Sequence, residues 1–253
     1  MNILDLGWNS DLQNHFTPYE SQGFTVGRVV KEHKRIYRVM TNQGEILAEL
    51  SGKIRFESSR RVELPAVGDW VVLKASGGHA LVHAILPRKS KFSRKVAGTV
   101  TEEQLIATNI DTVFLVNALN QDFNLRRMER YLLLTWESGA TPVIVLSKAD
   151  LCENIEQKLS EIRSIAYEVP ICTISATTNQ GLDSLASYLT KGQTIALIGS
   201  SGVGKSTLVN TLAGQEIQQV NEIRTEDGRG KHTTTYRELI LLPNGAVLMD
   251  TPG

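Results

Sequence analysis

The 253-residue chain has few cysteines and no long apolar segment. Cys152 and Cys172 are its only two cysteines. They form no close pair of the kind that clips a metal, and so few thiols favour a reducing cytoplasm. No apolar run approaches the length of a membrane-spanning helix, so no membrane partner is expected. The first residues, Met1–Asp5, lack the basic-then-apolar order of a secretory signal. These absences predict a soluble cytoplasmic protein.

The formal net charge of the whole chain is also zero, but its charges are unevenly distributed. The 27 Lys and Arg residues balance the 27 Asp and Glu residues. Between Glu20 and Lys95, however, the chain carries 15 basic residues against 7 acidic ones, and from Val96 onward the count is 12 against 18. A basic front half joined to an acidic back half indicates a polyanion-binding unit attached to a unit of different function.

Short β-branched or alternating runs dominate the front half, after an N-terminal extension of residues 1–21. Turn-forming residues separate five such runs, which are Val26–Val30, Ile36–Met40, Glu45–Leu50, Asp69–Leu73 and Leu81–Leu86. Five strands without a long helix between them predict a small β-barrel such as an OB-fold, which we place at residues 22–95.

The densest basic segment, residues 87–95, closes this unit. It is either a solvated linker or a nucleic-acid contact, because a basic cluster alone does not distinguish the two. The candidate RNA-binding residues in it are Arg88, Lys89, Lys91, Arg94 and Lys95.

Strands and helices alternate after Gly98, which predicts an α/β unit over residues 96–253. Thr101–Gln104 matches a capping box and predicts a short opening helix. The apolar strand segments are continuous, as in a parallel-dominated, doubly wound sheet with helices on both faces. The predicted strands are Thr112–Val116, Pro142–Leu146, Ile171–Ile174, Thr194–Ile198, Tyr236–Leu242 and Val247–Met249. The predicted helices are Asn124–Ser138, one with a face of Ile155, Leu159, Ile162 and Ala166, then Leu182–Leu189 and Lys205–Ala213.

A glycine-rich segment between the predicted strand Thr194–Ile198 and the predicted helix Lys205–Ala213 matches the Walker A pattern G-x4-G-K-[ST]. Such glycines let backbone N–H groups wrap phosphate oxygens, and the helix N-terminus adds partial positive charge. Lys205 would bridge the β- and γ-phosphates, and the Ser206 hydroxyl would hold Mg²⁺. The GTP-binding residues predicted here are Gly199, Ser200, Ser201, Gly202, Val203, Gly204, Lys205, Ser206 and Thr207.

A second segment, Ser-Lys-Ala-Asp at residues 147–150, follows an apolar strand where GTPases carry N-K-x-D. Asp150 would accept hydrogen bonds from guanine N1–H and the N2 amine, neither of which adenine offers. Lys148 would lie along the base plane. Ser147 replaces the usual Asn, so the sequence does not show whether the contact that braces this loop is kept. After the next strand, Ser175 and Ala176 resemble the third guanine-binding element.

Two further segments resemble the switches of GTPases. The polar stretch Gly228–Thr235 would carry the threonine that completes the Mg²⁺ shell, and we expect Thr234 in that role with Thr233 second. The alternative is a Ser/Thr-rich loop that merely enters a strand. Residues 250–253 match D-x-x-G. There Asp250 would reach Mg²⁺ through water and the Gly253 N–H would meet the γ-phosphate.

The order of these segments predicts a circular permutation. The base-reading segments precede the phosphate loop and D-x-x-G comes last, whereas most GTPases begin with the phosphate loop. This order, the basic barrel in front and the string Gly-Arg-Gly-Lys-His-Thr-Thr-Thr at residues 228–235 resemble the RsgA/YjeQ family of small-ribosomal-subunit-dependent GTPases. The resemblance covers essentially the whole chain.

The resemblance implies a GTPase that converts GTP to GDP with Mg²⁺ during late maturation of the small ribosomal subunit. It implies that the barrel contacts ribosomal RNA and that the subunit stimulates hydrolysis. It also implies a C-terminal zinc-binding domain with Cys and His ligands. We expect that domain beyond Gly253 and assign no zinc ligand within the chain. We expect a monomer.

The attacking water has one candidate partner in this sequence. Many GTPases orient it with a glutamine right after D-x-x-G, where the RsgA/YjeQ family usually has an apolar residue. His232 is therefore the candidate catalytic residue that positions water, together with Thr234 on Mg²⁺. A contact of His232 with RNA is the alternative. Two other functions stay open: an RNA-binding scaffold that senses GTP occupancy without significant hydrolysis, and an ATP-dependent P-loop enzyme, against which Asp150 argues.

Overall fold

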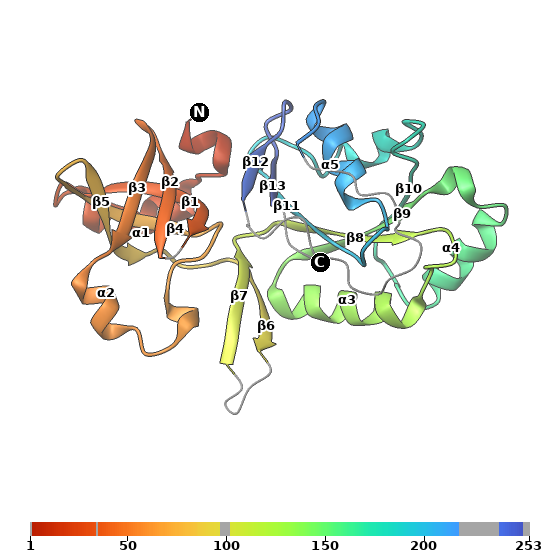
Figure 1. Ribbon diagram of the computed structural model, residues 1–253, viewed down its shortest axis with the longest axis horizontal. Helices are drawn as coiled ribbons and strands as arrows, with labels where there is room; N and C mark the ends of the chain where they lie inside the picture. The colour runs from red at the N-terminus through yellow and green to blue at the C-terminus, as the bar shows by residue number, and fades with distance from the viewer. Residues whose placement is uncertain (1, 34, 97–101, 218–237, 250–253) are drawn as a thin grey trace.

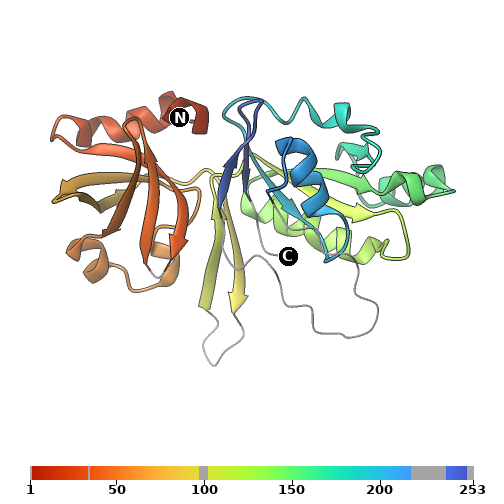
Figure 2. The ribbon, with the colours of Figure 1, turned by 45° about the horizontal axis from the view of Figure 1, so that its top comes forward.

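Two units lie side by side in the molecule, a β-barrel and a layered α/β unit (Figures 1 and 2). The computed structural model describes residues 2–33, 35–96, 102–217 and 238–249, and of residues 94–96 and 102–104 only the backbone. The strands β6 (Lys91–Val96) and β7 (Glu102–Thr108) pair with each other and lie between the two units in both views.

The first unit is a closed barrel of five strands. Its strands are β1 (Thr25–His33), β2 (Ile36–Thr41), β3 (Gly44–Leu50), β4 (Trp70–Ser76) and β5 (His79–Ile85). They pair in the order β1-β2-β3-β5-β4, and β1 closes against β4. Of these pairs only β3–β5 is parallel. The structure thereby confirms the predicted OB-like barrel. The short helix α2 (Gly52–Glu57) and the 3₁₀ turn η2 (Arg61–Glu63) separate β3 from β4.

Residues 2–21, which belong to the predicted N-terminal extension, form two helical segments. These are the 3₁₀ turn η1 (Ile3–Leu6) and the helix α1 (Ser10–Glu20). Asn9 caps α1 by accepting a hydrogen bond from the Leu12 N–H. Trp8 stacks edge-on against Trp70 of β4, with ring centroids 4.9 Å apart. The segment therefore belongs to the apolar core that joins barrel and α/β unit.

The prediction of a helix opening at Thr101–Gln104 was wrong, because residues 102–108 form a strand. Strand β7 pairs antiparallel with β6 in the register Lys91↔Thr108 to Val96↔Glu102. Leu105 and Ala107, two residues apart, are both buried, which is the period of a strand and not of a helix. The boundary that we predicted between residues 95 and 96 falls at the end of β6.

The second unit is built on a six-stranded sheet. Its strands are β8 (Thr112–Ala118), β9 (Thr141–Ser147), β10 (Ile171–Thr173), β11 (Thr194–Ile198), β12 (Leu239–Leu241) and β13 (Val247–Met249). The order is β10-β9-β8-β11-β13-β12, and every pair is parallel except β12–β13. The parallel-dominated sheet is the one that the continuous apolar runs predicted.

Helices cover both faces of this sheet (Figure 1). The helices α3 (Leu125–Ser138) and α4 (Ile155–Arg163) pack on one face, and α5 (Lys205–Ala213) packs on the other. Successive residues of β8 alternate between these two cores: Val113 and Leu115 belong to the first, Phe114 and Val116 to the second. The unit is therefore doubly wound, as predicted.

The segment Leu182–Leu189, predicted to be a helix, forms only the 3₁₀ turn η4 (Leu182–Leu185). Most of its backbone hydrogen bonds span three residues, as from the Tyr188 N–H to the Leu185 carbonyl. The Ser184 hydroxyl donates to the Gly181 carbonyl at 2.7 Å. Such local side-chain bonds compete with helical ones and favour tighter turns.

A fully buried arginine ties the two units together. Arg28 of β1 donates hydrogen bonds to the Leu6 carbonyl, the Gly68 carbonyl at 3.1 Å and the Asn109 carbonyl at 3.1 Å. It also donates to the Thr194 hydroxyl at 2.9 Å, at the start of β11. Burial lowers the pKa of Arg28 to about 10. Arg28 therefore fixes the barrel to the strand whose other end carries the glycine-rich segment.

Candidate nucleotide site

The glycine-rich segment forms a tight loop between β11 and α5. A Cβ atom on Gly199 would lie 2.4 Å from the Val116 carbonyl oxygen, so only glycine fits there. Gly204, which directly precedes α5, has a φ of +94°, a conformation that glycine adopts without strain. The loop therefore turns sharply and delivers the chain into the N-terminus of α5.

Lys205, the first residue of α5, folds back over this loop. Its ammonium donates to the Gly199 carbonyl at 2.7 Å and to the Ser200 carbonyl at 2.8 Å. Ser206 and Thr207 lie half-buried in the same turn of the helix. A cation and a helix N-terminus at one loop make a site for an anion such as phosphate.

The base-reading segment is joined directly to this loop. Ser147, the last residue of β9, is buried, and its hydroxyl donates a 2.6 Å hydrogen bond to the Val203 carbonyl. The serine that replaces the usual Asn thus makes a bracing contact. Lys148 adopts a left-handed conformation with φ +58°, and the next residue donates its N–H to the Ile174 carbonyl at 3.1 Å. Asp150 follows, exposed to solvent.

Ser175 and Ala176 form a third loop beside the other two. The Ser175 backbone exchanges hydrogen bonds of 2.9 and 3.0 Å with Gln180. The Thr211 hydroxyl of α5 lies 3.5 Å from the Ala176 carbonyl. The three loops follow the carboxyl ends of β9, β10 and β11, which run parallel, so they lie at one edge of the sheet. Ligands of open α/β sheets bind at such an edge.

Arg127 also reaches this edge, and our sequence analysis did not identify it. It lies in the first turn of α3, which Asn124 caps by accepting from the Arg127 N–H at 2.9 Å. Its guanidinium donates to the Ser200 hydroxyl at 2.8 Å. The helix α3 follows β8, the strand between β9 and β11. That position was the one signal in the sequence that could have drawn attention to Arg127.

Four predicted site residues, His232, Thr234, Asp250 and Gly253, lie outside the residues that the structure describes. Of the predicted Mg²⁺ ligands, Ser206 alone is among the described residues. Within residues 2–33, 35–96, 102–217 and 238–249, no group of three or more His, Cys, Asp and Glu side chains is placed to hold a metal ion. A GTPase magnesium site needs no such group, because it combines a loop hydroxyl with nucleotide oxygens and water.

Comparison with known proteins decides the family. Residues 85–253 match the family described as RsgA GTPase. The chain belongs to the RsgA GTPase family. It is thus a GTPase, as the order of its loops predicted, and the ATP-dependent alternative is set aside.

Relatives of this RsgA GTPase match along its full length. It is 48% identical over 256 residues to Small ribosomal subunit biogenesis GTPase RsgA 2 of Lactiplantibacillus plantarum, covering 100% of this chain and 71% of that protein. It is 45% identical to Small ribosomal subunit biogenesis GTPase RsgA of Opitutus terrae, covering 100% and 72%.

Solved structures share the fold of this RsgA GTPase. YjeQ from Thermotoga maritima superposes with a TM-score of 0.68 at 28% identity, over 91% of this chain and 75% of that one. YloQ, described as a circularly permuted GTPase, superposes with a TM-score of 0.61 at 24% identity, over 91% and 71%. The second likeness concerns the fold alone.

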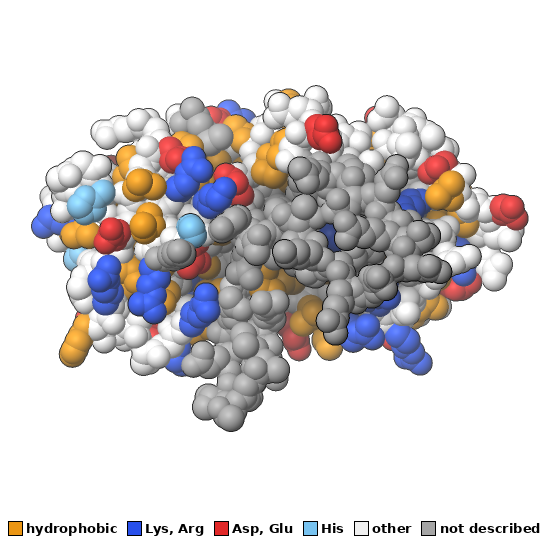
Figure 3. Space-filling view, in the orientation of Figure 1, with side chains coloured by type: hydrophobic (Ala, Val, Ile, Leu, Met, Phe, Trp, Pro, Cys, Tyr) orange, Lys and Arg blue, Asp and Glu red, His pale blue; other side chains and the backbone are white. Residues whose placement is uncertain are grey.

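Arg88 and Lys89, both predicted RNA-binding residues of this RsgA GTPase, make ion pairs with described residues of the chain. Arg88 donates to both carboxylate oxygens of the buried Asp69, at 2.8 and 2.6 Å, and to two backbone carbonyls of residues 62 and 64. Lys89 pairs with Asp111. Lys91 is exposed on β6, whereas the side chains of Arg94 and Lys95 lie outside the described part. Other Lys and Arg side chains are spread over the barrel (Figure 3).

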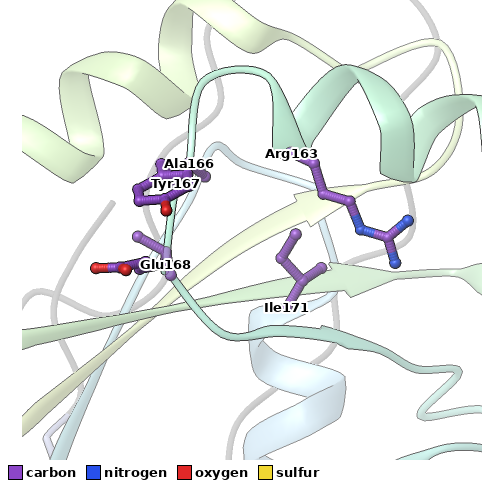
Figure 4. Close-up of a pocket in the computed structure, with 6 residues that line it drawn as sticks. Arg163, Ala166, Tyr167, Glu168 and Ile171 are labelled. Atoms are coloured by element: carbon purple, nitrogen blue, oxygen red, sulfur yellow. The ribbon is translucent and has the colours of Figure 1, made fainter.

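One surface pocket lies away from the nucleotide site of this RsgA GTPase. It has a volume of about 310 Å³ and lies at the end of α4 and the start of β10 (Figure 4). Arg163, Tyr167, Glu168 and Ile171 are among the residues that line it. This is the amino end of β10, the edge opposite to the loops.

In the described part of the chain, no helix is long and apolar enough to cross a membrane.

Proposed function

We propose that this chain binds guanine nucleotide at its three loops and hydrolyses GTP during late maturation of the small ribosomal subunit. The printed names of its relatives support the ribosomal role. The observation that carries the site is the hydrogen bond from Ser147 to the Val203 carbonyl. It joins the segment suited to guanine with the segment suited to phosphate, so that one ligand fits both.

Each loop has a distinct part in this proposal. Lys205 and the loop N–H groups hold the β- and γ-phosphates, and Ser206 coordinates Mg²⁺. Thr234 completes the metal shell and Asp250 reaches it through water. Asp150 reads the guanine edge, whose two donors a carboxylate accepts. His232 positions the attacking water.

The barrel is proposed to contact ribosomal RNA. Its net positive charge suits the phosphate backbone, and an OB-fold is a common nucleic-acid binder. Lys91, Arg94 and Lys95 on β6 are the proposed phosphate contacts, with Lys89 available when it leaves Asp111. The donors of Arg88 are engaged inside the barrel, so we propose a supporting role for Arg88. We further propose a cytoplasmic monomer whose hydrolysis the small subunit stimulates.

Base selection is tested with Asp150→Asn. An amide at this position donates where the carboxylate accepted, so it suits the 2-oxo group of xanthine. We expect this variant to lose GTP affinity by two orders of magnitude or more and to gain affinity for xanthosine triphosphate. Asp11→Asn, on the exposed side of α1 where the carboxylate is 83% exposed, is the matched control. Unchanged GTP binding by Asp150→Asn would remove the base-reading role.

Turnover is tested separately. Single-turnover hydrolysis of GTP is measured with and without purified small ribosomal subunits. Stimulation by the subunit supports the proposed function. Nucleotide-dependent subunit binding without any hydrolysis would instead identify an occupancy-sensing scaffold.

A further inference from the structure

We propose that Arg127 is a catalytic residue of this GTPase, contacting the terminal phosphate of GTP and stabilising the negative charge that develops during hydrolysis. The proposal rests on the function proposed above, namely GTP hydrolysis at the phosphate loop. It assigns to this chain an arginine of its own at the nucleotide, where some GTPases depend on an arginine from a partner protein.

The position of Arg127 relative to the phosphate loop supports this role. Its guanidinium lies 2.8 Å from the hydroxyl of Ser200, the second residue of the loop. The Lys205 ammonium lies 2.8 Å from the carbonyl of the same residue. Two cations therefore converge on one residue of the loop, and Lys205 is the cation that phosphate loops place on the β- and γ-phosphates.

The charge balance around Arg127 also points to an anionic ligand. Among the residues that the structure describes, Ser200 is its one hydrogen-bond acceptor and no carboxylate lies within ion-pair distance. Its neighbour Arg126 shows the contrast, with a side chain 84% exposed and paired with Glu129 at 3.1 Å. Arg127 is half-buried, and withdrawing a charge from water is unfavourable unless an opposite charge compensates it. A nucleotide phosphate is such a charge.

The chemistry of hydrolysis uses a fixed cation of this kind. A bond forms between the water oxygen and the γ-phosphorus, and the bond from the γ-phosphorus to the β–γ bridging oxygen breaks. The electron pair of that bond stays on GDP, and the proton lost by water ends on inorganic phosphate. Arg127 stays protonated throughout and exchanges no proton, because an arginine in a polar site keeps its charge. Its planar donors stabilise the oxygens on which charge increases.

The experiment compares Arg127→Ala and Arg127→Lys with Arg126→Ala. The last removes the same charge one residue away on the exposed side of α3. For each variant, affinities for GDP and for GTPγS and the single-turnover rate at saturating GTP are measured, with and without small ribosomal subunits. We expect Arg127→Ala to lower the rate by about 10³-fold or more. Its GDP affinity should stay within about 3-fold of the wild type, a change of well under 1 kcal/mol.

Selective loss of GTPγS affinity over GDP affinity supports contact with the terminal phosphate. We expect Arg127→Lys to recover only a small part of the rate, because an ammonium lacks the fork geometry. Arg126→Ala should behave as the wild type. A wild-type rate in Arg127→Ala would overturn the proposal, and so would an equal loss of GDP and GTPγS affinity with unchanged turnover at saturation, which identifies a loop brace.

Failure of this proposal is distinguishable from failure of the proposed function. A wild-type chain that does not hydrolyse GTP under either condition contradicts the function. Arg127 is then judged by nucleotide discrimination alone. In that case an unchanged ratio of GTPγS to GDP affinity in Arg127→Ala overturns its assignment.

Discussion

Removal of the Ser147 hydroxyl tests how strongly the base-reading loop supports the phosphate loop. This hydroxyl donates a 2.6 Å hydrogen bond to the Val203 carbonyl, and both residues are buried. The first hydrogen bond of α5 runs from the Leu208 N–H to the Gly204 carbonyl. The Val203 carbonyl therefore lies one residue before the helical ladder. In Ser147→Ala it loses its side-chain donor while still shielded from water.

The expected magnitude follows from that burial. An unsatisfied buried acceptor costs about 1–3 kcal/mol, and we predict that Ser147→Ala loses this much unfolding free energy. If GDP binds the loop conformation that this bond holds, the same free energy raises the Kd for GDP by about 5- to 150-fold. The two effects have one physical cause and should appear together.

Ser164→Ala is the matched control, because the Ser164 hydroxyl also donates to a carbonyl, that of Glu161 at 2.7 Å, but at an exposed helix end. Loss of an exposed bond is expected to change stability by about 0.5 kcal/mol or less. Calorimetric titration with GDP and urea unfolding measure both quantities on each variant. Wild-type GDP affinity together with wild-type stability in Ser147→Ala would refute the reasoning.

Two further predictions concern the framework of the site. Arg88→Met should destabilise the barrel by about 3–5 kcal/mol, because it leaves the fully buried Asp69 carboxylate unpaired. Urea unfolding followed by tryptophan fluorescence checks this, and a variant as stable as the wild type contradicts it. Arg28→Met should lower the unfolding free energy by about 3 kcal/mol or more, because three backbone carbonyls and the Thr194 hydroxyl lose a charged donor. Scanning calorimetry measures the second effect, and an unchanged melting temperature would contradict it.

Many helix and strand positions of the α/β unit could be predicted, because helix caps, glycines and apolar runs in its sequence agree with how these elements pack. The helix Lys205–Ala213 has the predicted bounds. The helix after Asn124 begins with that residue as its cap and ends at Gly139, which has a φ of +86°. The five barrel strands also follow their sequence patterns, because β2, β3 and β5 alternate in burial and β1 and β4 contain continuous buried runs.

The errors have physical causes that no local pattern carries. Thr101–Gln104 has the composition of a capping box, but pairing with β6 recruits residues 102–108 into a strand. Arg88 belongs to a basic cluster in the sequence, and only the fold reveals that Asp69 occupies its guanidinium. In the sequence, Arg127 does not differ from its surface neighbours on α3. Only the fold reveals its contact with Ser200, which lies 73 residues later in the chain. Contacts across such separations are set by topology.

The central place of β11 has a consequence for the synthesis of the chain. β11 lies between β8 and β13, with Ala196 paired to Val113 on one side and to Met249 on the other. During translation the base-reading loops leave the ribosome first, while β8 still lacks this neighbour. Both halves of the nucleotide pocket exist only once β11 has been made and has paired with a strand more than 80 residues earlier. We therefore expect nucleotide to stabilise the nascent protein only after β11 and α5 have been made, since a ligand stabilises a fold only in states that bind it.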